Sequence, residues 1–161
     1  MALKDAWLKP VYEDVFPEGT MLIGGIEPIT EYNADRSKPK KQKVDLDDFG
    51  NGTGKRLWKG TVADPTGSGA KGKTLDVVFV SDVQPVPSVP SVMPGYTPVV
   101  LEGLQVKPRI VGDGQFKSIG WSLRATGIVG DNSGANQPPA DVPASRPARN
   151  GRSANESEAV A

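Results

Sequence analysis

The chain has 161 residues, enough for one domain with a modest core. It contains no cysteine and no histidine, which excludes disulfides, thiol nucleophiles, Ser-His-Asp catalysis and the usual zinc sites. The formal net charge is zero, but residues 1–35 hold two lysines against seven acidic residues, whereas residues 36–73 hold ten Lys or Arg against four. A central segment this basic suits an anionic partner such as nucleic acid, with an exposed, solvated loop as the alternative.

No apolar run approaches the roughly 20 residues that span a bilayer. The start, Met1 to Asp5, lacks the charged-then-apolar build of a secretion signal. We therefore expect a cytoplasmic protein with no membrane association. The 19 glycines and 15 prolines indicate many turns and at least one unfolded segment.

Residues 1–130 have an all-β pattern, and only Asp5–Val15 could form a short helical turn. Turn signals separate the strands at Asn51-Gly52, in the Gly/Lys loop 65–73 and at Gly112-Asp113-Gly114. The predicted strands are Met21–Pro28, Arg56–Ala63, Thr74–Ser81, Val99–Val111 (with Pro108 as a candidate break) and Phe116–Ile128.

Five short strands with long loops predict a small five-stranded Greek-key barrel of the OB-fold type; a β-sandwich is the alternative. Two loops stand out: residues 33–55, which are polar and basic, and residues 84–98, which contain five prolines. The prolines favour a rigid connector across or between the ends of the sheet, with a partner-docking motif as the alternative. Residues 131–161 are poor in apolar side chains and are predicted to form a disordered tail.

Residues 67–74 match the phosphate-binding loop pattern G-x-x-x-x-G-K-[ST]. In that motif the loop opens a helix, whose N-terminus faces the phosphates. Here Thr74 is followed by Leu75 to Val80, a β-branched and aromatic run typical of a strand. The motif therefore predicts the tip of a hairpin rather than a nucleotide site.

Cations and aromatic residues cluster in this hairpin. Arg56, Lys59, Lys71 and Lys73 flank Trp58 and Phe79, an arrangement typical of single-stranded nucleic acid binding, where cations follow phosphates and rings stack on bases. Because a core also needs aromatic side chains, only part of the set is expected to stack. The aromatic candidates are Trp58, Phe79, Tyr96, Phe116 and Trp121.

Alternation in the last two strands predicts a second cationic surface. Leu104, Val106 and Ile110 share one face of the first strand, and Ile119, Trp121, Leu123 and Ala125 share one face of the second. The opposite faces would gather Lys107, Arg109, Lys117 and Arg124, with Gly120 as a candidate bulge. Clustered like charges are costly without an anion, which favours binding.

Catalysis is not expected. Asp45, Asp47 and Asp48 lack the glycine-punctuated pattern of a calcium loop, and spacing nominates no pair of carboxylates for acid-base chemistry. We therefore predict no enzyme activity, no metal and no cofactor.

Several segments between about residues 11 and 128 resemble the replication, integration and excision activators of actinomycete integrative plasmids. The matching pieces are Val15–Gly19, Leu22–Pro28, Leu57–Pro65, Val83–Pro87, Leu101–Pro108 and Leu123–Gly127. The stretch Val106–Arg109 with Gly114 and Leu123–Ala125 is also similar to filamentous-phage single-stranded-DNA-binding proteins. The first resemblance implies an accessory to DNA transactions rather than an enzyme, and the second implies an OB-like fold.

The predicted function is binding of DNA, more specifically single-stranded DNA, in support of replication, integration or excision of a mobile element. The pI near 6.3 is unusual for a strong DNA binder. One alternative is a protein-protein adaptor that recruits a replication initiator or recombinase through residues 84–98 without touching DNA. The other is a duplex-binding transcriptional activator, against which the lack of a helix-turn-helix pattern counts. A homo-oligomer remains open.

Overall fold

The computed structural model describes residues 6–67 and 74–133. They form eight strands and one short helix, α1 (Tyr12–Val15), so the prediction of an all-β chain is confirmed, as is a helical turn near the N-terminus. The strands are β1 (Thr20–Pro28), β2 (Leu57–Ala63), β3 (Thr74–Val80), β4 (Tyr96–Val99), β5 (Leu101–Glu102), β6 (Gln105–Val111), β7 (Ser118–Ala125) and β8 (Gly127–Ile128).

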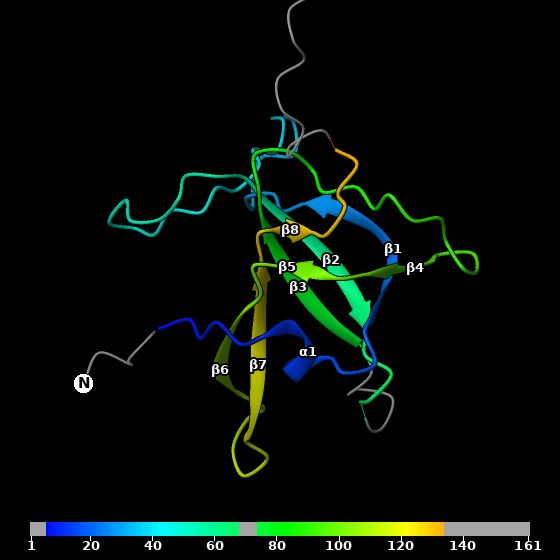
Figure 1. Ribbon diagram of the computed structural model, residues 1–161. Helices are drawn as coiled ribbons and strands as arrows, with labels where there is room; N and C mark the ends of the chain where they lie inside the picture. Colours follow the sequence, from blue (N-terminus) through cyan, green and yellow to red (C-terminus); the bar gives the residue numbers. More distant parts are fainter. Residues whose placement is uncertain (1–5, 68–73, 134–161) are drawn as a thin grey trace, which may run out of the picture.

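Six of the strands make one mixed sheet in the order β4-β1-β2-β3-β7-β6 (Figure 1). All neighbours are antiparallel except β3 and β7, which run parallel with Val77 opposite Leu123. β5 and β8 form a separate antiparallel pair. Over the described residues this sheet is open, with β4 and β6 at its edges, and the predicted closed five-stranded barrel is not found as one continuous ladder.

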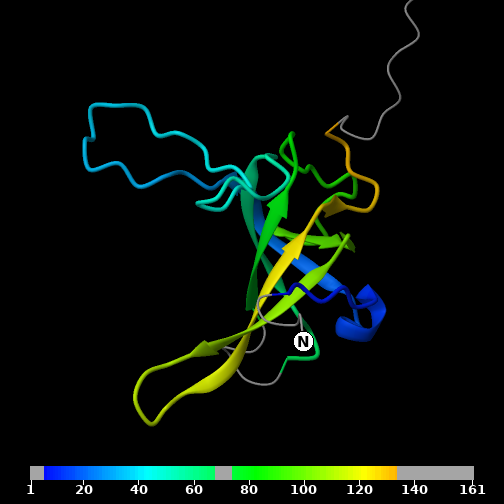
Figure 2. The ribbon, with the colours of Figure 1, turned by 90° about the vertical axis from the view of Figure 1, so that its left-hand side faces the viewer.

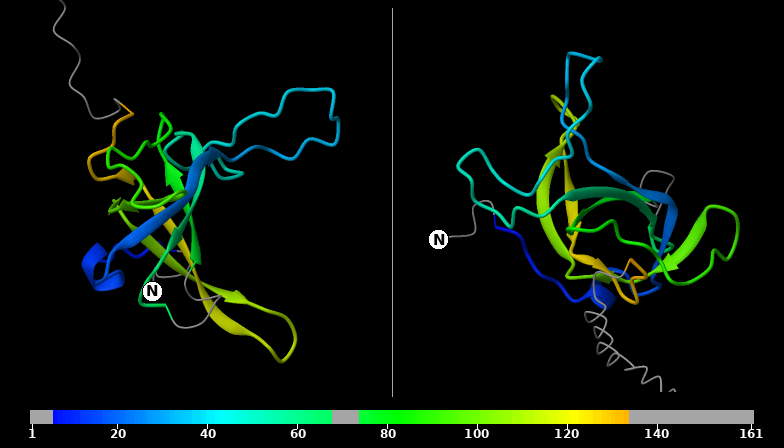
Figure 3. Two further views of the ribbon diagram at one scale, coloured as in Figure 1. Left: turned by 90° about the vertical axis from the view of Figure 1, so that its right-hand side faces the viewer. Right: turned by 90° about the horizontal axis from the view of Figure 1, so that it is seen from above.

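The sheet is nevertheless strongly curled, as the view from above shows (Figure 3, right). Part of the bend lies in β1, whose register with β2 shifts between Ile23 and Glu27. Gly24 supplies a positive φ of 69° at this irregularity, and its amide bonds to the carbonyl of Gly95 next to β4. A bulge of this kind bends a strand and increases its twist, which lets β1 pair with β2 on one side and β4 on the other.

The predicted strand Val99–Val111 is interrupted in a different place from the one expected. The breaks fall at Val100 and at Gly103, where φ is 62° and a Cβ would lie 2.3 Å from Thr126 Oγ1. Pro108 instead lies inside β6, opposite Trp121. Val106 exchanges backbone hydrogen bonds with Leu8 on the side away from β7, and Pro108, two residues on, presents its nitrogen to the same side. The proline therefore costs the ladder no hydrogen bond, as is usual on an edge strand.

The core lies inside the curl of the sheet. On β2, Trp58, Gly60 and Val62 are buried, while Lys59 between them is exposed, which is the period-two pattern of a strand with one wet face. The partner positions on β3 are equally apolar. The buried cluster is Phe16, Leu22, Ile26, Trp58, Val62, Val77, Phe79, Val99, Leu101, Leu104, Leu123, Ala125 and Ile128.

The proline-rich segment joins β3 to β4, two strands separated in the sheet by β1 and β2. Pro85 is fully buried, and the side-chain amide of Gln84 donates through Nε2 to the carbonyl of Ile26. The start of the predicted tail is fixed against this segment, because Asp131 Oδ1 accepts from Val86 N at 2.9 Å and Asn132 N donates to Val86 O at 2.8 Å. The prediction of disorder was therefore wrong for residues 131–133. Residues 134–161 lie outside the described part.

Phe79 and Phe49 allow the stability contribution of a buried ring to be compared with that of an exposed ring. Phe79 is 0% exposed and Phe49 is 90% exposed. We expect Phe79→Ala to lower the free energy of unfolding by about 3–5 kcal/mol, because it removes a buried ring and leaves a cavity. Phe49→Ala, the matched control, should change it by less than about 0.5 kcal/mol. Urea unfolding followed by tryptophan fluorescence measures both, and equal effects would contradict the assigned core.

Candidate nucleic-acid interface

The outer face of the sheet, opposite the core, carries a row of cations. Directly paired residues point to the same side of a sheet, so the pairs Lys59↔Val78 and Val78↔Arg124 place Lys59 and Arg124 on one face. The pairs Lys107↔Ser122 and Arg109↔Gly120 continue that face along β6 and β7. The alternation predicted for this hairpin is thus seen, without a register shift at Gly120, which faces the Val111 side chain so closely that a Cβ would lie 2.8 Å from Val111 Cγ1.

Two connections project from the body. The β6–β7 hairpin and residues 30–43 extend on the same side of the molecule (Figure 2), whereas residues 45–55 extend in another direction (Figure 3, right). One is the hairpin of β6 and β7. The other is the β1–β2 connection, residues 29–56, which folds into two fingers: a basic finger, residues 30–43, held by Glu31 N to Lys41 O at 2.8 Å, and a second finger, residues 45–55, held by Asp45 N to Lys55 O at 2.8 Å. The outer face of the sheet lies between these projections.

The basic finger concentrates positive charge. Its two acidic residues are Glu31 and Asp35, and Asp35 forms an exposed ion pair with Lys38 at 3.7 Å. Part of the finger surrounds an open hollow of about 710 Å³. The exposed cations of the finger are Arg36, Lys38, Lys40, Lys41 and Lys43.

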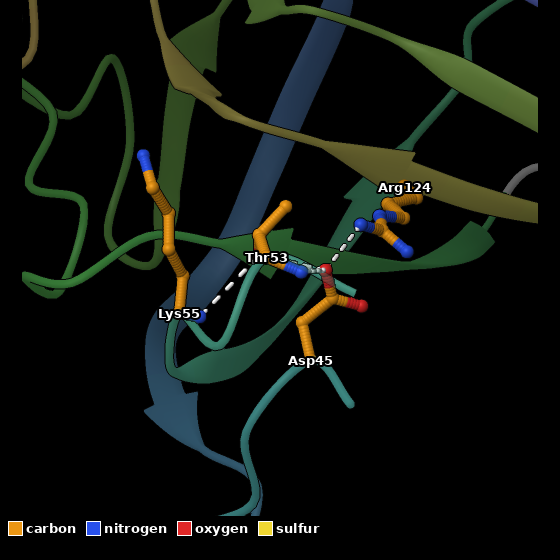
Figure 4. Close-up of polar contacts among 4 residues, drawn as sticks. All are labelled: Asp45, Thr53, Lys55 and Arg124. Carbon is orange, nitrogen blue, oxygen red and sulfur yellow. Dashed lines mark hydrogen bonds and ion pairs between the residues drawn. The ribbon is translucent and has the colours of Figure 1, made fainter. Parts of the chain in front are cut away.

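Arg124 holds the second finger against the sheet (Figure 4). Its Nη2 lies 2.7 Å from Asp45 Oδ2, with side-chain exposures of 23% and 14%, and its guanidinium lies 5.7 Å from the Trp7 ring centroid. Asp45 Oδ2 also accepts from the Thr53 amide at 3.1 Å and from its hydroxyl at 2.7 Å. The charge of Arg124 is thus matched by a carboxylate, and its guanidinium holds the second finger. The contact of Arg124 with nucleic acid stays a prediction.

Burial raises the pKa of the Asp45 carboxyl, but hydrogen bonds from Thr53 and the charge of Arg124 outweigh it and hold the pKa below its ordinary value. The carboxylate is therefore ionised at neutral pH, as the pairing with Arg124 requires.

Trp58 and Phe79 do not lie on the surface, which corrects the expectation that they stack on bases. Trp58 is 8% exposed and donates its indole N–H to Ser81 O at 2.9 Å, and Phe79 is 0% exposed. Both sit on the inward side of paired strands, opposite each other. Their burial leaves the neighbouring Lys59 on the outer face, where its 3.4 Å pair with Asp76 is exposed and weak.

The most exposed aromatic rings of the described residues are on the projections. Tyr32 on the basic finger is 93% exposed, Phe49 on the second finger 90%, and Phe116 at the hairpin tip 89%; Trp121 and Tyr96 are 50% and 37% exposed. Tyr32 and Phe49 were not among the aromatic residues predicted to bind. The available signal was an aromatic residue flanked by polar residues outside any strand pattern, as in Glu31-Tyr32-Asn33 and Asp48-Phe49-Gly50.

The remaining candidates are distributed around these features. Arg56 is exposed where the fingers return to the sheet, and Lys117 is exposed at the hairpin tip, beyond the outer-face row. Lys71 and Lys73 lie outside the described residues. On either side of them Ala63 pairs with Thr74, so β2 and β3 form an antiparallel hairpin and Thr74 begins a strand. The strand-to-helix context of a phosphate-binding loop is therefore absent, as predicted.

Residues 6–67 and 74–133 contain no cluster of three or more Asp or Glu that could hold a metal ion, and no helix there is long and apolar enough to cross a membrane. Comparisons of the chain with protein-family models, curated proteins and solved structures find no match.

The Asp45–Arg124 pair makes a pH-dependent contribution to stability. We expect Asp45→Asn to lower the free energy of unfolding at pH 7 by about 1–3 kcal/mol, since it removes charge-assisted hydrogen bonds from a largely buried site. The folded-state pKa lies below the unfolded value of ~3.9. The contribution is therefore complete above about pH 5 and is lost as the pH falls through the folded-state pKa.

Urea unfolding of wild type and Asp45→Asn between pH 7 and about pH 2.5 measures this difference directly. The gap between the two proteins should narrow at acid pH. Asp82→Asn, which changes an exposed carboxylate, serves as the control and should leave stability unchanged. A gap that stays constant across this range would contradict the assignment.

Proposed function

We propose that this protein binds single-stranded DNA and has no catalytic activity. The observation that carries the proposal is the outer sheet face with Lys59, Lys107 and Arg109, bordered on one side by fingers that bear cations and the exposed rings of Tyr32 and Phe49, and on the other by the β6–β7 hairpin. Such a surface matches the two needs of a single strand: cations along the phosphate backbone and rings against the unstacked bases.

We also propose that the sheet follows an OB-like path. β5 continues β4 after one residue, β8 continues β7 after one residue, and β5 pairs with β8. We count β4 with β5 as one bent strand and β7 with β8 as another, and leave β6 outside the count. The pairings then run β1-β2-β3-β7/β8-β5/β4 and return to β1, and the one parallel pair is β3 with β7.

This path supports the choice of ligand surface. In OB-folds, nucleic acid binds over the second and third strands, between the first connection and the one that precedes the last strand. In this chain those connections are residues 29–56 and the β6–β7 hairpin, which are the two that project (Figure 2).

The charge distribution explains how a neutral chain can still bind an anion. The acidic residues Glu13 and Asp14 lie on α1, on the side of the body opposite the projections (Figure 2). The cations of the basic finger lie on the ligand side. A field is set by local charge rather than by the total, so a pI near 6.3 is compatible with a basic ligand surface.

Single-stranded DNA is preferred over duplex for two reasons. Exposed rings at the ends of projections reach bases only where those bases are unpaired. In the described part of the chain the one helix, α1, has four residues, too few for the recognition helix of a helix-turn-helix protein. The resemblance to plasmid replication, integration and excision activators supports the further proposal that this binding serves a mobile element.

A second candidate function is recruitment of a replication initiator or recombinase without DNA contact. It is favoured by the exposed apolar side chains of the proline-rich segment, where Val89, Val92 and Met93 are 50%, 63% and 55% exposed. Binding to labelled oligonucleotides separates the two functions. Absence of binding to single strands and duplex at low salt would reject the DNA proposal and favour the adaptor.

Removal of finger cations tests the phosphate contacts. We expect the triple change Lys40→Ala, Lys41→Ala and Lys43→Ala to weaken single-strand binding and to reduce the slope of log K against log salt by about 0.7 per lost contact. Lys9→Ala, an exposed cation before α1, is the control and should leave the slope unchanged. Fluorescence anisotropy across a salt series measures both. Equal slopes in the triple variant and wild type would show that the finger does not contact phosphates.

Exposed rings give an independent test of base contacts. Tyr32→Ala and Phe49→Ala should each weaken single-strand binding by about 1–3 kcal/mol if the ring stacks on a base. The salt slope should stay at the wild-type value, because no ionic contact is lost. Tyr96→Ala, on β4 at the far edge of the sheet, is the matched control. Titration with a short oligonucleotide, followed by fluorescence, reads each affinity; wild-type affinity in both variants would remove stacking from the proposal.

A further inference from the structure

The inner face of the β6–β7 hairpin is apolar along its whole length. The pairs Val106↔Leu123, Pro108↔Trp121 and Ile110↔Ile119 place six apolar side chains on the face that continues the core. Near the body Leu123 is 4% exposed, but farther out Trp121 is 50%, Ile119 74% and Ile110 75% exposed. The apolar face therefore continues from the core along the projecting β6–β7 hairpin (Figure 2). We call its exposed part, formed by Pro108, Ile110, Ile119 and Trp121, the bare face.

The four side chains of the bare face lie together on two paired strands. Contiguous exposed apolar surface of this kind is typical of sites that meet a partner. None of the four side chains carries a charge, whereas the reverse side of the same hairpin holds Lys107 and Arg109. One side of the hairpin thus suits an anion and the other suits another apolar surface.

The base of the bare face opens into an apolar pocket of about 370 Å³. Asp64 is the one charged residue among those that line it, which are Val15, Phe16, Asp64, Leu75, Val106, Trp121 and Leu123. At the other end of the hairpin, the tip carries Phe116, 89% exposed, next to Lys117. The tip and the pocket are complementary, because the Phe116 ring can fill the apolar pocket and Lys117 can pair with Asp64.

Within one chain the tip and the pocket cannot meet. Phe116 and Leu123 are seven residues apart along the chain, which at about 3.3 Å per residue is roughly 23 Å. A second copy turned by a two-fold axis would bring each tip to the other's pocket. In such an antiparallel arrangement Lys117 approaches Asp64 of the other copy, whereas a parallel one would put like charges together.

We propose that the bare face is a homodimer interface. Two hairpins pack apolar face on apolar face in antiparallel fashion, and the Phe116 ring of each enters the pocket at the base of the other. The contact is isologous, so every interaction occurs twice. The outer faces with Lys59 and Arg109 point away from the axis, which leaves both ligand surfaces accessible on opposite sides of the dimer. This interface does not depend on the proposed DNA binding.

The first test is the mass in solution without DNA. Sedimentation equilibrium between about 1 and 100 µM should give a dimer for wild type. Ile119→Ser and Phe116→Ser should each raise the dissociation constant at least about tenfold. The controls are Phe49→Ser and Val92→Ser, which remove exposed apolar side chains elsewhere and should stay dimeric. A monomeric wild type, as expected if another chain or another part of this chain covers the face, would overturn the proposal.

The second test uses the absence of cysteine from the sequence. A single Ile119→Cys or Val92→Cys change introduces the only thiol, so a short bismaleimide can join nothing but two copies. Cross-linked dimer from Ile119→Cys and not from Val92→Cys is the expected result. Since this change keeps an apolar side chain, it also separates interface loss from misfolding, which circular dichroism checks for all variants. Equal cross-linking at both positions, or none at Ile119→Cys, would reject the interface.

Discussion

The rest of the structure depends on the parallel pairing of β3 with β7. Val77, Val78 and Phe79 pair with Leu123, Arg124 and Ala125, so the last long strand lies directly beside the first antiparallel hairpin. Parallel neighbours need a long crossover, and here residues 81–117 supply it. That crossover contains the proline-rich segment, β4, β5 and β6. Its closure buries Leu123 and Ala125 against Val77 and makes one core from two ends of the chain.

The same pairing determines where the charges go. Because Arg124 faces outward beside Val78, it meets Asp45 of the second finger and Trp7 of the N-terminal segment. A largely buried ion pair is costly unless its hydrogen bonds are satisfied, and Asp45 is satisfied by Thr53 as well as by Arg124 (Figure 4). The contact holds one finger on the sheet. It leaves the basic finger and the cations of β6 to form the proposed ligand surface.

Local patterns were sufficient for the parts of the fold that depend on neighbours in sequence. Residues 56–63 were predicted as a strand and contain β2, and the β-branched run after Thr74 predicted a strand in place of a nucleotide-binding helix. The site was harder. From the sequence, Trp58 and Phe79 could be either base-stacking rings or core residues. Both side chains are large and apolar, and alternation along a strand does not show which face of the sheet is covered by the rest of the protein. Tyr32 and Phe49 lie in connections, outside the alternating pattern of any strand.

The sequence by itself determined that the chain is β-rich, where most strands lie, and that it has neither thiol nor imidazole chemistry. These follow from residue type and period, which act over a few residues. Tertiary structure alone decided which aromatic rings are buried, that Arg124 binds Asp45 79 positions away, and that the apolar side of the β6–β7 hairpin extends beyond the core. Each of these depends on which strands become neighbours. Strand pairing depends on contacts between residues far apart in the sequence, formed as the whole core packs. A short stretch of sequence therefore does not show which strands will pair.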